Sequence, residues 1–401
     1  MIILYILFSI FFFVNGSESK IKEMIFKDYN KDTMPNNSAV DLRLGMAIRS
    51  LNNIDQVEGT LSSNIWLRHW WNDRNLRWNQ TEWNISKIAF YTDPEYDRSI
   101  WIPDMFIYNT AEKPMDELYY THAMVYSNGD VMWSRPGMMK TSCVFDLKHF
   151  PFDQQTCSYK FGSWVYDSSQ LNLSISTPAV DMSNYQLNQE WEIIETKHTL
   201  EEKIYKCCPE KYQSAVYIIK IRRKPGYYIL NIILPTFATS TLMVLCLLIP
   251  WDSGERISFA VTVMLSIIVF LLILSESLPK TNTKPLLSKM LIGLVFFSLF
   301  VVFSTVVIGV MHSYTKKNNK FAKKLLGLFN KYNIGCKKKQ QLNRNDSYLG
   351  TINAITNHAN NASDDNDCDK LATIIERIFT SVFVIAFVIY CAVIFGEKPS
   401  Y

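Results

Sequence analysis

Four long apolar runs limit what this sequence can fold into more than any other feature. They lie at residues 226–248, 257–275, 291–310 and 378–395, and none contains a charged side chain. Each run approaches the roughly 20 residues that a helix needs to cross a bilayer. A bundle of buried soluble helices is the alternative, but four runs of this length argue against it. The sequence therefore predicts a membrane domain with four spanning helices.

The polar segment between the third and fourth runs predicts how these helices are oriented. Lysines crowd its first half, at positions 316, 317, 320, 323, 324, 331 and 337–339. Because basic residues are enriched in cytoplasmic loops, this segment is predicted to be cytoplasmic and both ends of the chain to lie outside. The basic stretch 222-RRK-224, just outside the first run, is a local exception.

The first 16 residues, MIILYILFSIFFFVNG, favour the same orientation. They are short, strongly apolar and end in a small residue, which is typical of a secretory signal cleaved after Gly16. A membrane anchor is the alternative, but the stretch is short for a span. An exported domain can carry glycans, and four asparagines fit the Asn-x-Ser/Thr acceptor pattern: Asn36, Asn79, Asn84 and Asn172.

The sequence of residues 17–224 predicts a β domain. Apolar and polar residues alternate in short stretches such as 215-AVYIIKI-221, separated by turns such as 127-SNGD-130. A helical pattern appears only near residues 35–52, where Val40, Leu44 and Ile48 recur every four positions. A β-sandwich of about 200 residues accounts for the rest.

The chain has eight cysteines, and only the four before residue 225 lie in the predicted exported domain. Cys143 and Cys157 enclose 13 residues; closing such a loop with a disulfide contributes roughly 3 kcal/mol. Cys207 and Cys208 are adjacent, and neighbouring Cα atoms lie only about 3.8 Å apart. A bond between them would close a tight, strained ring. Metal ligation by this pair is the alternative, and it lacks a nearby His or a second Cys pair.

The second apolar run has a face suited to line a pore. Its members are spaced three and four residues apart, which keeps them on one side of a helix. The face is acidic and hydroxylated at its inner end, apolar in the middle and acidic at its outer end: Glu255, Ser258, Thr262, Leu265, Val269, Leu272 and Glu276. Rings of acids favour cations, and an apolar constriction can gate by dewetting. The alternative, charges that only mark the bilayer edge, explains Glu276 better than Glu255.

Several long, ordered motifs occur along the chain. They are 64-NIWLRHWWNDRNLRWN-79, 101-WIPDMFIYN-109, the loop between Cys143 and Cys157 with FPFDQQ, 161-FGSWVYD-167, the Cys207–Cys208 pair, 222-RRKP-225 and 252-DSGERISF-259. Together they resemble Cys-loop ligand-gated ion channels, in particular α-type subunits of nicotinic acetylcholine receptors. The resemblance covers nearly the whole mature chain. It implies a pentamer whose subunits each have an extracellular β-sandwich followed by a four-helix transmembrane bundle.

The resemblance also implies a ligand site between subunits. Its principal face would comprise an aromatic box with the adjacent cysteines: Tyr108, Trp164, Tyr205, Tyr212, Cys207 and Cys208. Its complementary face would comprise Trp66, Met124, Met132 and Ser134. Disulfides would join Cys143 to Cys157 and Cys207 to Cys208. Core packing is the alternative for any single aromatic residue, but these match separate motifs that meet at one site.

The domain boundaries follow from the apolar runs and the resemblance. They are 1–16 for the signal peptide, 17–224 for the extracellular domain, 225–311 for three spans with the pore helix at about 255–276, 312–371 for the cytoplasmic loop, 372–395 for the fourth span and 396–401 for the extracellular tail.

The predicted function is that of a cation-selective channel subunit opened by acetylcholine or a similar amine. In the family, anion channels carry Pro-Ala-Arg where this chain has Gly254-Glu255-Arg256. Expected partners are membrane lipid, related subunits in a homo- or hetero-pentamer, and permeant sodium, potassium and calcium ions. A postsynaptic plasma membrane is expected, but no enzyme activity, cofactor, metal or nucleic acid. The alternatives are a channel gated by another amine or choline-like ligand and a non-conducting binding or auxiliary subunit that requires partner subunits.

Three positions depart from the α-type pattern. Ser214 stands where an Asp is usual, although the expected partner Lys160 is present. Gln56 stands at the position of the usual acidic partner of Arg223, with Asp55 beside it. The link 279-PKTNTKP-285 is one residue shorter than usual. All three bear on how binding is coupled to opening.

Overall fold

The structure is a computed structural model that describes residues 17–35, 39–112, 118–249, 254–280, 285–317, 377–378 and 380–390. The chain divides into two compact units by its contacts. The first comprises Met1–Leu147, Pro151–Pro225 and Leu278–Lys280, and the second Lys148–Phe150, Gly226–Ser277 and Thr281–Tyr401. The predicted signal peptide, Asn36, residues 318–371 of the cytoplasmic loop and the tail lie outside the described residues.

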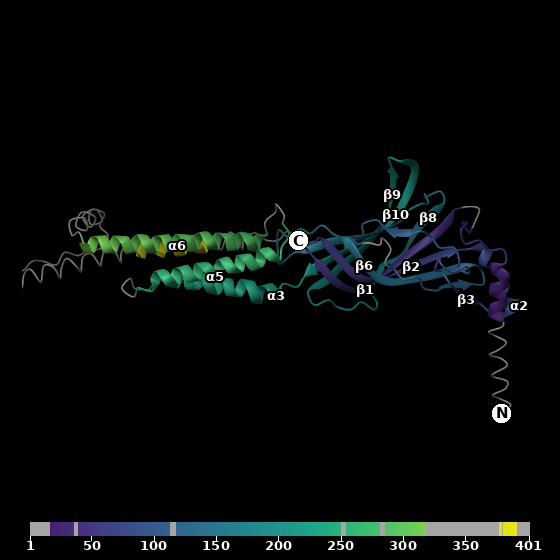
Figure 1. Cartoon of the computed structure of the whole chain (residues 1–401), viewed down its shortest axis with the longest axis horizontal. Coiled ribbons are helices and arrows are strands. Elements are labelled where there is room, and N and C mark those ends of the chain that lie inside the picture. Colours follow the sequence, from purple (N-terminus) through teal and green to yellow (C-terminus); the bar gives the residue numbers. More distant parts are fainter. Residues whose placement is uncertain are drawn as a thin grey trace, which may run out of the picture. The chain divides into compact units, whose positions relative to one another are not determined.

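The first unit is a sandwich of two β-sheets, as predicted (Figure 1). One sheet has six strands in the order β3-β5-β6-β2-β1-β8, and the other has four in the order β4-β7-β10-β9. The strands are β1 (Val40–Asp55), β2 (Thr60–Asn72), β3 (Lys87–Phe90), β4 (Met105–Ile107), β5 (Ala123–Tyr126), β6 (Asp130–Ser142), β7 (Gln154–Ser163), β8 (Leu171–Asp181), β9 (Trp191–Tyr205) and β10 (Cys208–Arg223). Two short helices, η1 (Arg74–Leu76) and α2 (Gln80–Trp83), follow β2.

Alternation along the strands builds the core of this sandwich. In β2 and β6, every second side chain is buried, and the residues between them are mostly half-buried on the opposite face. Large aromatic side chains fill the space between the sheets, among them Trp133, Tyr159, Phe161, Trp191 and Tyr217. Burial of each such side chain removes a large apolar area from water, which stabilises the fold.

The helical pattern expected near residues 35–52 is wrong. Val40, Leu44 and Ile48 lie in strand β1, and Leu42 and Met46 between them are buried too. Steps of four residues are also even steps, so one face of a strand contains them as readily as one face of a helix. A helix instead covers residues 17–26, where Ile21 and Ile25 are buried.

The second unit contains the predicted transmembrane helices. Residues Gly226–Cys246, Arg256–Glu276 and Leu286–Val310 are long and apolar enough to cross a membrane. The first of these comprises α3 (Gly226–Tyr228), the π-helical turn η2 (Ile229–Ile233) and α4 (Leu234–Cys246). The others are α5 (Arg256–Glu276) and α6 (Leu286–Lys317).

The fourth predicted span is described only at residues 377–378 and 380–390, which are helical. This segment packs against α6. The Phe297 ring lies 5.7 Å from the Phe383 ring and 5.2 Å from the Tyr390 ring. The Tyr390 hydroxyl also donates a hydrogen bond to the Lys289 carbonyl at 2.8 Å. An aromatic contact of this kind holds an apolar helix in place where the hydrophobic effect between helices is absent.

Candidate functional site

Tyr108 is anchored on strand β7 by its backbone and by its hydroxyl. Its N–H donates to the Lys160 carbonyl at 2.8 Å, and its hydroxyl donates to the Ser163 carbonyl. The ring lies over Gly162, where an added Cβ would come within 2.6 Å of it. Burial raises the pKa of Tyr108 to about 12, with smaller contributions from the nearby Tyr205, Asp104 and Tyr212. Glycine at position 162 therefore makes room for a neutral phenol beside the other tyrosines.

Trp164 follows β7 directly and presents its indole outward. Its side chain is 63% exposed, and its ring meets the edge of Phe106 at 6.4 Å. One carboxylate holds this segment, because Asp104 accepts hydrogen bonds from the N–H groups of Trp164 at 3.1 Å and Val165 at 2.8 Å. The Ser163 hydroxyl donates to the same carboxylate.

Asp104 is thus a site residue that the sequence patterns did not predict. It lies inside the quoted motif 101-WIPDMFIYN-109, but its hydrogen-bond partners lie 59 to 61 positions further along the chain. No local pattern connects it to Trp164.

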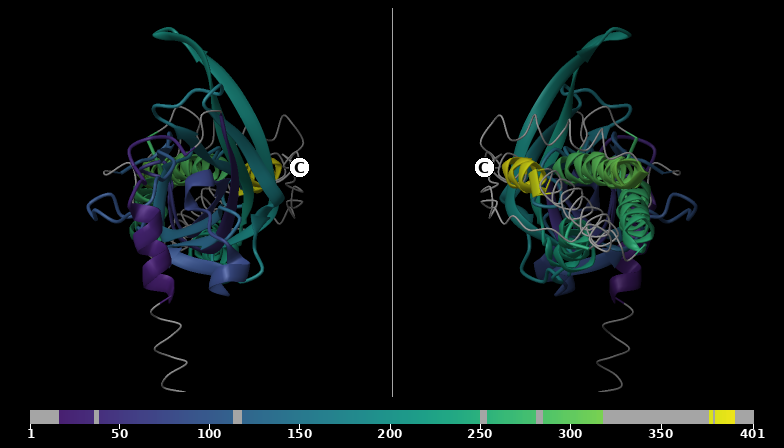
Figure 2. Two further views of the ribbon diagram at one scale, coloured as in Figure 1. Left: turned by 90° about the vertical axis from the view of Figure 1, so that its right-hand side faces the viewer. Right: turned by 90° about the vertical axis from the view of Figure 1, so that its left-hand side faces the viewer.

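The β9–β10 hairpin carries the other two tyrosines and extends past the rest of its sheet (Figure 2). Tyr205 ends β9 and pairs with Cys208, which begins β10. Cys207 and Cys208 form a disulfide at this turn, with their Cα atoms 3.8 Å apart. The Tyr205 and Tyr212 rings meet edge to face at 5.8 Å.

Strand β9 supplies the acidic partner of Lys160 that is missing at Ser214. Glu201 pairs with Ser214 across the strands, and its carboxylate meets the Lys160 ammonium at 2.6 Å. Ser214 lies on β10, between β7, which carries Lys160, and β9, which carries Glu201. Lys160 therefore keeps an acidic partner, supplied by a different strand from the one expected.

The complementary-face residues gather on the six-stranded sheet. Met124 pairs with Met132, and Ser134 lies on the same strand as Met132, two residues on. On the neighbouring strand β2, Trp66 pairs with Pro136. All four predicted side chains are half-buried between buried neighbours, so they share one face. The box residues belong to the other sheet and the segments that continue it, and this separation fits a site made by two subunits.

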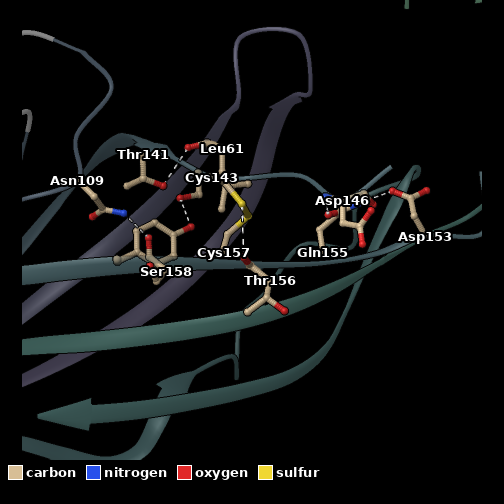
Figure 3. The surroundings of a disulfide bond; sticks show 12 residues. Leu61, Asn109, Thr141, Cys143, Asp146, Asp153, Gln155, Thr156, Cys157 and Ser158 are labelled. Carbon is tan, nitrogen blue, oxygen red and sulfur yellow. Dashed lines mark hydrogen bonds between the residues drawn. A yellow bond between two sulfur atoms is a disulfide. The ribbon is translucent and has the colours of Figure 1, made fainter. Parts of the chain in front are cut away.

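The disulfide Cys143–Cys157 is confirmed, with Cα atoms 5.2 Å apart (Figure 3). Gln155 braces the enclosed loop. Its amide oxygen accepts from the Asp146 N–H at 2.9 Å, and its amide nitrogen donates to the Asp146 carbonyl at 2.8 Å and to the Asp153 carboxylate.

Arg223 has acidic partners, although Gln56 occupies the position of the usual one. Arg223 is fully buried and makes two hydrogen bonds to the Asp153 carboxylate, at 2.8 and 3.2 Å. A third, at 2.8 Å, reaches Glu190, and the guanidinium lies 4.1 Å from the centre of the Trp191 ring. A buried charge needs such compensation. The carboxylates of Asp153 and Glu190 neutralise the charge of Arg223, the central residue of the basic stretch 222-RRK-224.

The predicted pore face lies on the exposed side of α5. Leu265, Val269 and Leu272 are 58%, 44% and 58% exposed, and Ala260, Val263 and Ile267 are buried on the other side. The remaining predicted members are also exposed: Glu255, Ser258, Thr262 and Glu276. In the described part of the chain, this helix therefore turns its predicted pore face away from its own subunit.

Three of the four predicted glycan acceptors are described, and all are exposed: Asn79, Asn84 and Asn172. Asn79 caps α2, and Asn172 donates a hydrogen bond to Asp41 at 2.8 Å. Among the described residues, no group of three His, Cys, Asp or Glu side chains could hold a metal ion.

Comparison with known families defines the class of protein to which this geometry belongs. Residues 18–225 match the neurotransmitter-gated ion-channel ligand binding domain, and residues 232–352 match the neurotransmitter-gated ion-channel transmembrane region. The chain belongs to this family of Cys-loop ligand-gated ion channels. As predicted, it is a multi-pass membrane protein with an extracellular N-terminal domain and is not an enzyme.

Individual relatives are neuronal acetylcholine receptor subunits. The chain is 36% identical to the human alpha-2 subunit over 302 residues, which is 74% of this chain and 56% of the relative. It is 36% identical to the alpha-6 subunit of Pan troglodytes over 301 residues, 74% of this chain and 60% of the relative. For the mouse alpha-2 subunit the values are 35% over 309 residues, 76% and 59%. The chain thus spans less than two thirds of these relatives' length.

Proposed function

We propose that this chain is a subunit of a cation-selective ion channel that acetylcholine, or a similar small amine, opens. The observation that carries the proposal is the grouping of Tyr108, Tyr205 and Tyr212 beside the segment that presents Trp164. The hydroxyl of Tyr108 donates to the Ser163 carbonyl, next to Trp164, and the Tyr205 and Tyr212 rings, which contact each other, lie close enough to Tyr108 to add to the burial that raises its pKa.

An aromatic group of this kind suits a quaternary ammonium. Such a cation has no N–H to donate, so aromatic faces hold it, each contributing about 0.5–2 kcal/mol when desolvated. Trp is the best of these faces. The Cys207–Cys208 ring stiffens the hairpin tip that carries Tyr205 and Tyr212, and closure of the hairpin would bring both tyrosines onto the ligand.

The proposed pore is the exposed face of α5, repeated around a pentamer. Glu255 and Glu276 would form acidic rings at the cytoplasmic and outer ends, and Leu265 a central apolar girdle. Acidic rings concentrate cations, and an apolar girdle excludes water until it widens. In this proposal the domains have the predicted boundaries, and the channel lies in a postsynaptic plasma membrane, glycosylated at its acceptor asparagines.

The test is to record currents from cells that express this chain, alone and together with related subunits. Acetylcholine, choline and several biogenic amines are applied in turn. We expect acetylcholine-evoked current whose reversal potential follows the sodium gradient and ignores the chloride gradient. A reversal potential that follows chloride contradicts the pore assignment, and a current evoked only by another amine contradicts the ligand assignment. Binding without current, alone and with partners, favours the auxiliary subunit.

A further inference from the structure

The complementary-face tryptophan carries a cation from its own chain. The guanidinium carbon of Arg49 lies 4.4 Å from the centre of the Trp66 ring. At this distance a guanidinium is attracted to the ring by the same cation–π interaction that holds a quaternary ammonium. The face of Trp66 that Arg49 covers is therefore already occupied.

An irregularity in strand β1 aims Arg49 at this ring. The pairing of β1 with β2 shifts between Ile48 and Ser50, which makes Arg49 the extra residue of a bulge. Its carbonyl accepts a hydrogen bond from the Gln186 N–H at 2.7 Å, which fixes the backbone there. Bulges redirect side chains, and both Arg49 and Trp66 are half-buried on the same sheet.

The charge of Arg49 is not cancelled by a carboxylate. Arg68, two positions after Trp66 on the same strand, pairs with Asp181 at 2.9 Å. Within the part of the chain that the structure describes, Arg49 makes no such ion pair. An ammonium that approached Trp66 would therefore meet a full positive charge at close range, and like charges repel strongly where water is excluded.

On the principal face, unlike the complementary face, the cationic side chain beside an aromatic ring is exposed. Lys203 lies 5.2 Å from the centre of the Tyr205 ring, but it is exposed on the projecting hairpin. A long lysine side chain there can turn into water when a ligand enters, whereas Arg49 is half-buried on the sheet.

We infer that Arg49 weakens amine binding wherever this chain supplies the complementary face, so that a different subunit is needed there. This inference rests on the proposed function. The partner is a related subunit whose tryptophan at the position of Trp66 has no basic side chain over it. Arg49 is then the residue that makes contacts between two copies of this chain poor amine sites.

The test compares three forms of the full chain expressed alone: the unchanged chain, Arg49→Gln and Arg43→Gln. Arg43 is the matched control because it lies on the same strand and covers another tryptophan, Trp70, at 4.9 Å. Surface pentamers are first counted for each form, and equilibrium binding of labelled acetylcholine is then measured per pentamer. We expect Arg49→Gln to bind acetylcholine at least tenfold more tightly, and Arg43→Gln to match the unchanged chain.

A second variant tests whether the gain in acetylcholine affinity depends on the Trp66 ring. Adding Trp66→Leu to Arg49→Gln should abolish the gain, because the uncovered ring is then lost. Equal affinity of the unchanged chain and Arg49→Gln overturns the inference, as does failure of both to bind. A separate variant tests the proposed function. If Trp164→Ala leaves acetylcholine binding unchanged in every form that binds, the principal face itself is wrongly assigned.

Discussion

Trp164 in the β unit and Leu265 in the helical unit are almost equally exposed, at 63% and 58%, yet exposure has a different cause in each. In the sandwich, backbone hydrogen bonds to Asp104 hold the segment of Trp164 outward, and in the proposed function an amine covers the exposed indole. In a membrane helix, exposed apolar side chains are the rule, because lipid or a pore covers them.

The two side chains are also fixed in different ways. Leu265 lies in a regular helix, where its direction follows from counting residues along α5. The direction of Trp164 depends on Asp104, which is 60 positions away and accepts from its N–H. Binding and gating should therefore fail separately when each is changed, and the predictions below test that separation.

The largest effect is expected from Trp164→Ala. Losing one desolvated cation–π face costs up to about 2 kcal/mol, which corresponds to roughly a 30-fold loss of acetylcholine affinity. Val165→Ala is the control, because Val165 is the next residue, is 64% exposed and is also held by Asp104. Radioligand binding on surface pentamers measures both. If the two variants lose affinity equally, the effect belongs to the loop and not to the indole.

The next largest effect is expected from Leu265→Ser. Exposing a leucine side chain to water costs about 1.5–3 kcal/mol, and serine removes that barrier to a wetted pore. We expect the half-maximal acetylcholine concentration to fall about tenfold, which corresponds to about 1.4 kcal/mol, or the channel to leak without agonist. Ile273→Ser is the control, since Ile273 is 49% exposed but lies off the predicted pore face. Equal effects of the two would show that α5 has no single pore-lining face.

Trp164 and Leu265 also differ in how well the sequence alone predicted their surroundings. The exposed face of α5 followed from spacings of three and four residues, because one helix and its N-cap residue, Glu255, contain all its members. The aromatic box came only from resemblance to a family, because its residues lie on separate strands. Nothing local in the sequence pointed to Asp104 or to the Glu201 partner of Lys160. Both depend on strand pairing, which periodicity alone does not specify.

Mild reduction followed by alkylation should affect the binding region alone. Cys207 is exposed, whereas Cys143 and Cys157 are 6% and 2% exposed, so the adjacent pair should react first. We expect a several-fold rise in the half-maximal acetylcholine concentration, because the hairpin tip loses its constraint. Peptide mapping of the untreated protein should show Cys207 bonded to Cys208. A bond between Cys143 and Cys207 would contradict this assignment.

A smaller effect is expected from Glu201→Gln, which removes the partner of Lys160. Both side chains are partly exposed, at 26% for Lys160 and 47% for Glu201, and such pairs contribute about 0.2–1 kcal/mol. We expect the half-maximal acetylcholine concentration to rise by at most about fivefold. Glu202→Gln is the control, because Glu202 pairs with Lys211 instead. Introducing Ser214→Asp should restore the Glu201→Gln channel, and its failure to do so would show that the Lys160 charge pair is not what matters.

The smallest effect is expected from Glu255→Gln, and it should leave binding untouched. Glu255 is exposed immediately before α5, so five copies would place a ring of negative charge at the cytoplasmic end of the pore. Removing the ring lowers the local cation concentration without altering the apolar girdle, so we expect single-channel conductance to fall by about a third to a half. Glu255→Asp keeps the charge and should conduct nearly as the unchanged channel does. Because the change lies outside the β unit, the half-maximal acetylcholine concentration should stay constant. A shift in that concentration with unchanged conductance would mean that Glu255 acts on opening and does not line the conducting path.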